Sequence, residues 1–347
     1  MKPETMTSLE RCLATIHFQP HDRVPVDLHN FMMTLVEVDL PPEKIYRDGR
    51  LLGEAQLAAW RRFGHDMLLV ENGTAALAEA CGCQPSYLKG GAPLIEKPLL
   101  GSLEEVHQLR MPDPWNSPLC RAVLDATRFL LDEIGGEVCV MGRADQGPFD
   151  LANMIAGPET LMTAMALGES DELIFELLEY TSDAYIAYAK IFREIGCPGT
   201  SAGEALCSPD VISPKMYEKY CLPYGKKIVK ALQDDDFFLA YHTCGNTTRI
   251  IERMAETGAH ILEFDYKCDK IAARRAVSKT TLLGPIDPSG VLQRGSVSDV
   301  EAACREAIEI LAPGGGFILG PGCALPGTTP AANIDKLVEC AKTYGRY

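Results

Sequence analysis

The stretch FFLAYHTCGN, residues 237–246, joins a short apolar run to two side chains that bind transition metals. The apolar run is too short for a helix and has the length and composition of a buried strand. His242 and Cys244 follow it two residues apart, so an extended chain points both side chains to the same side. An imidazole and a thiolate presented together at a strand end are typical of a zinc site.

A second short apolar run, GFILGPG at residues 316–322, ends directly before Cys323. We therefore predict that His242, Cys244 and Cys323 are three ligands of one zinc ion, with a fourth position open for chemistry. A His-x-Cys pair alone is a weak signal for a metal. Its position at a strand end, together with a cysteine in a glycine-rich turn at another strand end, makes the signal specific.

The order of the segments indicates a fold that can bring these strand ends together. Short apolar runs alternate with helical segments at residues 24–29, 66–71, 138–144, 200–205, 237–242, 261–265, 281–287 and 316–322. Eight strands that alternate with helices predict an α/β fold of the (β/α)8 TIM-barrel type. The alternative is a doubly wound open sheet, which would need fewer strands or a nucleotide-binding loop. The glycines at 314–316 precede a strand instead of following one, so they are not such a loop.

We expect one domain over residues 1–347, because barrels of this kind commonly reach this length. The sequence TSLE at residues 7–10 is a capping box, which predicts an N-terminal helix before the first strand. Residues 83–116 contain five prolines and are expected to form an excursion of short strands and loops.

The composition excludes several classes of function. A net charge of −15 argues against a nucleic-acid partner. No apolar run has the length of a membrane span, and the N-terminal MKPETMTSLERC lacks the apolar core of a signal peptide. We therefore expect a cytoplasmic protein without a membrane partner. The 13 cysteines are scattered and odd in number, which favours free thiols over a disulfide framework.

Polar side chains cluster where the predicted strands end, and barrel enzymes build their active sites on that face. These residues are Glu71, Asn72, Arg143, Asp145, Glu204, His242, Cys244, Asp265, Asp287 and Cys323. Their shared position favours an enzyme.

At these residues the chain resembles the uroporphyrinogen decarboxylase superfamily, and more narrowly its zinc methyltransferase branch, the methylcobalamin:coenzyme M methyltransferases. The resemblance covers nearly the whole chain. It is carried by HDRVPV (21–26), GHDMLLVENG (64–73), SPDVISPKMYEKYCLPYGKKI (208–228), HTCGN (242–246), LEFD (262–265), LLGPIDP (282–288) and GGGFILGPGCALPGTTPAANI (314–334).

The resemblance implies a catalytic zinc ion on His242, Cys244 and Cys323. It also implies a corrinoid (methylcobalamin or cob(I)alamin) carried by a partner protein. Asp265 sits where this branch has an acidic residue near the metal, described as a displaceable fourth ligand; capping of the next helix is the alternative. The decarboxylases carry an arginine-rich signature after their first strand, whereas VDLHNFMMTL (26–35) has no arginine. A polycarboxylate porphyrin would lack its basic clamp here, so decarboxylase activity is not expected.

Further side chains near the mouth receive roles as expectations. Glu204 and Glu71 would orient the substrate or support the zinc ligands, although Glu204 could instead cap a helix or accept from backbone amides. Arg143 would contact an anionic group of the substrate. Asn246 would hydrogen-bond to nearby backbone or to the cofactor.

Several functions stay open from the sequence. One is methyl transfer between the corrinoid and a small-molecule thiol. Another is O-demethylation of a methoxylated compound, which an apolar pocket near Met32 and Phe149 would favour. A third is a non-enzymatic corrinoid or zinc carrier, although a structural zinc takes four protein ligands and only three are evident. The expected partners are a corrinoid protein and a small-molecule methyl donor or acceptor, with a homodimer left open.

Overall fold

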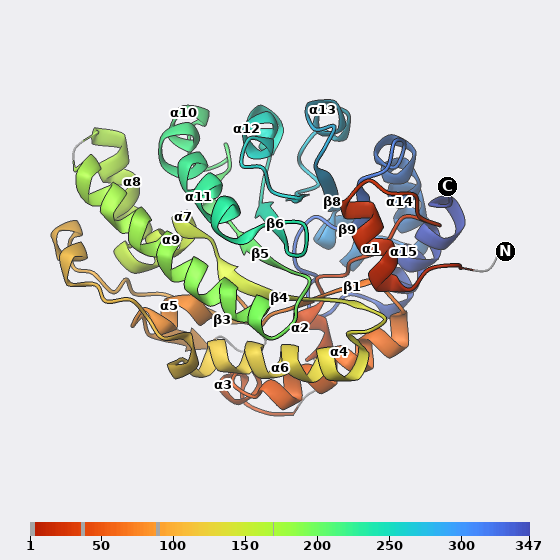
Figure 1. Cartoon of the computed structure of the whole chain (residues 1–347), viewed down its shortest axis with the longest axis horizontal. Coiled ribbons are helices and arrows are strands. Elements are labelled where there is room, and N and C mark those ends of the chain that lie inside the picture. The colour runs from red at the N-terminus through yellow and green to blue at the C-terminus, as the bar shows by residue number, and fades with distance from the viewer. Residues whose placement is uncertain (1–3, 36–38, 88–90, 169) are drawn as a thin grey trace.

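A sheet of seven parallel strands forms the centre of the computed structural model, which describes residues 4–35, 39–87, 91–168 and 170–347. The strand order is β1-β4-β5-β6-β7-β8-β9. The strands are β1 Met67–Val70, β4 Cys139–Gln146, β5 Gly199–Gly203, β6 Phe238–Thr243, β7 Ile261–Phe264, β8 Thr281–Ile286 and β9 Phe317–Pro321. The sheet curls, and helices cover its outer side in chain order, as Figure 1 shows. The barrel-type α/β fold is therefore confirmed.

The first predicted strand, residues 24–29, is not a regular strand. It closes the sheet between β9 and β1 through two isolated bridges, Val26 with Leu319 and Asp27 with Met67. Pro25 has no amide hydrogen to donate, and His29 already has a φ of +44°, outside the extended region. Both features shorten the ladder, so seven strands and one bridging segment stand where eight strands were predicted.

The helices agree closely with the periodic segments of the sequence. They are α1 Ser8–Ile16, α2 Phe31–Thr34, α3 Pro42–Ile45, α4 Gly49–Phe63, α5 Ala76–Ala80, α6 Pro118–Ile134, α7 Pro148–Ala156, α8 Pro158–Leu167, α9 Asp171–Glu194, α10 Pro214–Met216, α11 Leu222–Leu232, α12 Ile251–Ala255, α13 Lys270–Ala276, α14 Val297–Leu311 and α15 Ala331–Tyr344. Shorter 3₁₀ or π turns are η1 Leu103–Gln108, η2 Pro114–Asn116, η3 Ala205–Cys207, η4 Tyr217–Cys221, η5 Thr247–Arg249 and η6 Pro288–Gln293. Within the described ranges, no helix combines the length and apolar character needed to cross a membrane.

The predicted excursion is also confirmed. β2 Pro85–Tyr87 and β3 Pro93–Ile95 pair antiparallel in a separate two-stranded sheet, and η1 and η2 follow before α6 returns to the barrel.

Alternate strand residues fill the interior of the barrel. One buried apolar cluster contains Met67 and Leu69 of β1, Cys139 and Met141 of β4, Phe238 and Ala240 of β6, Ile261 of β7, Leu283 of β8 and Ile318 of β9. Cys12 and Ile16 of α1 belong to the same cluster, so the N-terminal helix packs against the strand interior. The intervening strand residues, such as Leu68 and Leu239, pack in the larger cluster with the outer helices.

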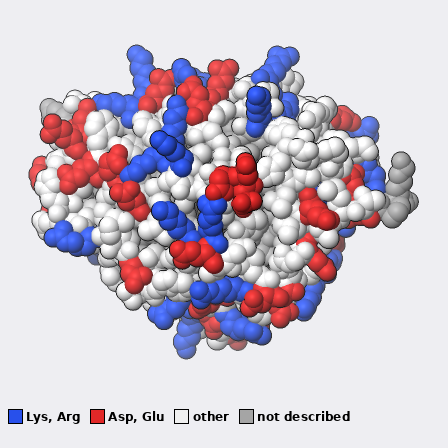
Figure 2. Space-filling view, viewed as in Figure 1, with Lys and Arg blue, Asp and Glu red and all other residues white. Residues whose placement is uncertain are grey.

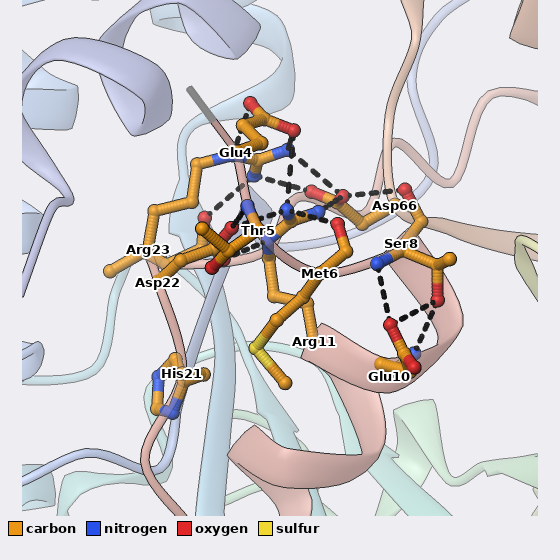
Figure 3. Close-up of polar contacts among 12 residues, drawn as sticks. Glu4, Thr5, Met6, Ser8, Glu10, Arg11, His21, Asp22, Arg23 and Asp66 are labelled. Atoms are coloured by element: carbon orange, nitrogen blue, oxygen red, sulfur yellow. Dashed lines mark hydrogen bonds and ion pairs between the residues drawn. The ribbon is translucent and has the colours of Figure 1, made fainter. Parts of the chain in front are cut away.

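A buried group of charges fastens α1 to the start of β1 (Figure 3). Asp66 accepts hydrogen bonds from Arg11 Nη1 at 2.6 Å and from Arg23 Nη1 at 2.7 Å. Asp22 and Glu4 complete the pairing of the two guanidinium groups. The capping box of α1 is present, with Glu10 accepting from the Thr7 amide as the sequence predicts.

The surface charges are mixed in sign. On the face drawn in Figure 2, lysine and arginine side chains alternate with aspartate and glutamate and form no continuous basic surface. This face therefore lacks the clustered positive charge that binding to phosphate backbones requires.

Candidate metal centre

A layer of polar side chains lies directly above the apolar interior of the barrel. Leu69, Met141, Ala240 and Ile261 belong to the interior cluster, and the residues two positions later are Glu71, Arg143, His242 and Glu263. A strand repeats its side-chain direction every two residues, so these four side chains also point inward. All four are buried, with at most 4% exposure. The polar layer thus occupies the carboxyl ends of the strands, where barrel enzymes carry their chemistry.

The three predicted zinc ligands come together at this end. The ligand atoms of His242, Cys244 and Cys323 all lie within 4.8 Å of one another. His242 Nε2 is 3.0 Å from Cys244 Sγ, and the two sulfur atoms are 3.8 Å apart. Zinc bonds of about 2.3 Å to sulfur, arranged tetrahedrally, place two sulfur ligands about 3.8 Å apart. The residues present therefore fit a zinc ion.

The two cysteines differ in how readily they ionise, because the hydrogen bond between them raises the pKa of Cys244 and lowers the pKa of Cys323. The hydrogen bond from the Cys244 thiol and the neighbouring His242 imidazole lower the pKa of Cys323 well below its ordinary value, although burial opposes this. Cys323 is therefore the thiol that ionises first, and a thiolate is the form that binds zinc. Cys244 and Cys323 are both partly exposed, whereas His242 is buried. A metal held by these three residues would be approached from the side of the two cysteines.

Asp265 lies beside the loop that contains Cys244 and Gly245 and accepts hydrogen bonds from backbone amides. Its Oδ2 accepts from the Gly245 amide at 2.8 Å, and its Oδ1 accepts from the Lys267 amide at 3.2 Å. Burial raises the pKa of this carboxyl above its ordinary value. The carboxylate thus holds the backbone directly after Cys244, and helix α13 is capped by Asp269 instead.

The buried charges continue across the barrel. Glu263 Oε1 is 3.4 Å from His242 Nδ1 and 3.2 Å from His29 Nδ1. His29 also forms an ion pair with Glu71, and Arg143 Nε lies 3.3 Å from the other oxygen of Glu71. Burial alone would raise the pKa of Glu263, but His242, His29 and Arg143 outweigh it and lower the pKa to about 2. Burial alone would lower the pKa of His29, but Glu71 and Glu263 raise it well above its ordinary value.

Arg143, predicted to bind an anionic substrate group, is occupied by protein partners. Its guanidinium contacts Glu71 and donates from Nη1 to Ser201 Oγ at 3.4 Å. Glu71 is part of the polar layer, and its role toward a substrate or a metal stays a prediction.

Glu204 accepts from backbone amides. Its two oxygens receive the amide hydrogens of Phe149 at 3.2 Å and Asp150 at 2.9 Å, at the start of α7. Asp150 in turn accepts from the amides of Ala205 and Leu206. Burial and the neighbouring Asp150 raise the pKa of Glu204 well above its ordinary value. Each carboxyl group therefore accepts from backbone amides next to the other one. For Glu204 this is the structural role that was considered as the alternative.

The remaining candidates lie outside the polar layer. The Asn246 side chain is on an exposed residue and accepts from the Thr248 amide at 3.2 Å, so it caps η5. Phe149 is fully buried in α7, and Met32 is half-buried against the core in α2. Their roles toward a cofactor or substrate stay predictions.

His29 and Glu263 were missed as site residues. A signal for Glu263 was present, because it lies two residues before Asp265 in the run ILEFD and two residues after the apolar Ile261. His29 ends the first apolar run, as His242 ends the fifth. The strand-end rule applied to the first predicted strand would have selected His29, and the two-residue period counted from Ile261 would have pointed Glu263 inward.

Comparison with known proteins places this site in a family. The family described as uroporphyrinogen decarboxylase (URO-D) matches residues 7–344. The chain belongs to the uroporphyrinogen decarboxylase family. This match contains all strands of the barrel and every residue of the polar layer.

Relatives within the family carry two different names. The methylcobamide:CoM methyltransferase MtbA of Methanosarcina acetivorans is 30% identical, over 97% of this chain and 98% of its own length. The protein of the same name from Methanosarcina mazei is 31% identical over the same shares. A uroporphyrinogen decarboxylase of Xanthomonas axonopodis is 27% identical, over 98% of this chain and all of its own length.

A solved structure supports the fold. A structure described as a methyltransferase from Methanosarcina mazei has a TM-score of 0.88 to this chain at 23% identity, covering 97% of this chain and 99% of the other. At this identity the agreement confirms the barrel and its connections.

Proposed function

We propose that the protein is a zinc-dependent methyltransferase that moves a methyl group between a corrinoid, carried by a partner protein, and a small-molecule thiol. The single observation that carries this proposal is the convergence of His242, Cys244 and Cys323 at the open end of the barrel. The relatives named as methylcobamide:CoM methyltransferases support the direction of the proposal.

Zinc held by one imidazole and two thiolates would bind a substrate thiol, lower its pKa and keep the thiolate nucleophilic. The protein contributes the arrangement. His242 presents Nε2 to the sulfur atoms while Nδ1 faces Glu263, so the proton of a neutral imidazole resides on Nδ1. Asp265 fixes the loop that carries Cys244 through the Gly245 amide. Cys244 and Cys323 are partly exposed residues, which supports access of a substrate from their side of the site.

The other functions considered receive less support. An apolar pocket at Phe149 would favour O-demethylation, but this ring is fully buried in the core. Decarboxylation of a porphyrin would require cations for its carboxylates. The bridging segment and α2 provide no arginine or lysine in residues 26–35, His29 is enclosed by Glu71 and Glu263, and Arg143 is already paired with Glu71.

The proposal is tested first by metal content. The purified protein is expected to hold close to one zinc ion per chain, and Cys323→Ser is expected to lose it. Cys81→Ser is the matched control, because Cys81 is a free cysteine of the same partial exposure outside the site. A wild-type chain without zinc, or equal zinc in Cys323→Ser, would contradict the proposal.

Activity is tested with free methylcobalamin as the donor. The zinc-loaded protein is mixed with a panel of small thiols, and loss of the cobalt–methyl absorbance is followed together with the methyl thioether product. We expect turnover with at least one thiol and none in Cys323→Ser. A zinc-loaded protein inactive with every thiol, with or without a corrinoid protein as carrier, would refute thiol methylation.

A further inference from the structure

The carboxylate of Glu263 lies behind the imidazole of His242, at ion-pair distance and with no hydrogen bond formed between them. Its Oε1 lies 3.4 Å from Nδ1 of His242, the ring nitrogen that faces away from the cysteines. A ligating histidine generally donates its second ring N–H to a carboxylate or carbonyl, and this contact fixes the tautomer and the orientation of the ring. Glu263 is 1% exposed, so water does not compete for this contact.

The register of the sheet explains why the two side chains meet. His242 of β6 is paired directly with Glu263 of β7 in the parallel ladder. Both side chains point into the barrel, so they stand beside each other on neighbouring strands. The contact therefore joins two paired strands of the central sheet, and Cys244 lies on the loop just beyond β6.

Glu263 is itself held from across the barrel. His29 of the bridging segment approaches the same Oε1 at 3.2 Å through its Nδ1. His29 also pairs with Glu71 beyond β1, and Glu71 pairs with Arg143 of β4. One oxygen atom of Glu263 thus joins two imidazoles, and the chain of contacts connects β4, β1 and the bridging segment to β6 and β7.

We infer that Glu263 is a positioning residue for the metal centre, which keeps His242 in the tautomer and ring orientation that present Nε2 to zinc, and that His29 holds Glu263 in place. This inference rests on the proposed function, because it assumes that the three ligands bind zinc. It adds a residue that does not touch the metal but sets how tightly the metal is bound. Asp265 is a separate support, since it acts on the backbone after Cys244.

A buried carboxylate can also contribute only to the stability of the fold. Asp145 provides a comparison for this alternative. Asp145 is equally buried at 3% exposure, lies at the same end of β4 and accepts from the Leu77 amide at 2.7 Å. Its described partner is a backbone group and not a histidine. A general effect of neutralising a buried carboxylate near the mouth would appear in Asp145→Asn as well as in Glu263→Gln.

The test measures zinc affinity of the full chain by competition with a chromophoric chelator. Glu263→Gln keeps the shape of the side chain, and Glu263→Ala removes it. We expect zinc affinity to fall about 10–100-fold in Glu263→Ala, the range typical of lost supporting contacts, with a smaller fall in Glu263→Gln. Asp145→Asn is expected to stay within about 3-fold of the wild type. Zinc release to excess chelator should accelerate in the same order.

A second readout follows the geometry of the site. Co²⁺ replaces zinc in the wild-type chain and in the three variants, and its visible bands report the ligand set and its symmetry. We expect altered bands in Glu263→Ala and unchanged bands in Asp145→Asn.

The outcomes separate the two proposals. Zinc affinity and cobalt bands equal to wild type in both Glu263 variants, with or without a lower melting temperature, would overturn the positioning role and leave the proposed function intact. Absence of zinc binding in the wild-type chain would overturn both. Should Glu263→Ala fail to fold, Glu263→Gln decides alone, because its amide preserves the volume of the side chain.

Discussion

Asp66 is the residue whose loss we expect to destabilise the fold most. It is fully buried and accepts hydrogen bonds from Arg11, Arg23, the Ser8 hydroxyl and the Val26 amide. Asp66→Asn removes the charge that compensates two buried guanidinium groups and keeps the volume. Breaking a buried ion pair by changing one partner typically costs about 3–5 kcal/mol. We expect a loss of this size in the free energy of unfolding, a large share of the roughly 5–15 kcal/mol of a typical protein.

The assay is urea unfolding, followed by circular dichroism at pH 7. Asp335→Asn serves as the matched control, because Asp335 also pairs with an arginine at 2.6 Å, but Arg62 and Asp335 are 55% and 43% exposed. An exposed pair contributes about 0.2–1 kcal/mol, so the control should shift the unfolding midpoint little.

The pH dependence has a definite sign. Burial would raise the pKa of Asp66, but Arg23 and Arg11 outweigh it and lower the pKa below its ordinary value of 3.8. The stabilisation is therefore present above about pH 4 and is lost as the pH falls further. The difference between wild type and Asp66→Asn should shrink in that acidic range. Equal, small losses in Asp66→Asn and Asp335→Asn at pH 7 would refute the reasoning.

Two further predictions concern the barrel interior. Burial raises the pKa of Asp27 to about 7, so the folded state favours the neutral form of this carboxyl group. The free energy of unfolding of the wild type should therefore fall as the pH rises from about 4 through 7, by at most about 1.4 kcal/mol per pH unit. Asp27→Asn should show a smaller decline of the melting temperature over the same pH range. An unchanged slope in the variant would contradict this. Gly203→Ala would place a Cβ 2.1 Å from Arg143 Nη2, so we expect a loss of about 1–3 kcal/mol in urea unfolding, whereas Gly136→Ala, with open space around it, should be nearly neutral. Equal stabilities of the two alanine variants would show that Arg143 moves freely.

The sequence predicted that His242, Cys244 and Cys323 converge, because each lies at the end of a short apolar run. In a parallel barrel the carboxyl ends of all strands lie at the same end of the barrel. Residues 242 and 323 could therefore be predicted to lie close together from the order of the strands alone. The same rule predicted Glu71 and Arg143 near the mouth. The sequence did not predict which protein groups these side chains contact. Arg143 was assigned to an anionic substrate group, which stays a prediction, and the structure adds its ion pair with Glu71, directly after β1.

Register explains the other omissions. The contact between His242 and Glu263 depends on which residues of β6 and β7 stand opposite each other, and an apolar run does not fix that alignment to one residue. The bridging segment was predicted as a full strand because VPVDLH has strand composition. A proline without an amide hydrogen and a residue with positive φ interrupted the ladder, and their effect on pairing requires the neighbouring strands to be known.

The bridging segment at residues 24–29 closes the barrel between β9 and β1 by isolated bridges instead of a full ladder, and we call this junction the seam. Six backbone hydrogen bonds hold this segment. Asp27 and Leu319 donate across its contact with β9, and Asp66 and Met67 both donate to Val26. Val24 donates to Gly345, and Leu325 donates to His29. The adjacent pair β8 and β9 is in register over five residue pairs. Local opening therefore requires least work at the seam, and amide deuterium should enter there before it enters the central strands. His29 ends this segment. Local opening there would therefore weaken the contact between His29 and Glu263, while the strands that lead to the candidate metal ligands stay paired.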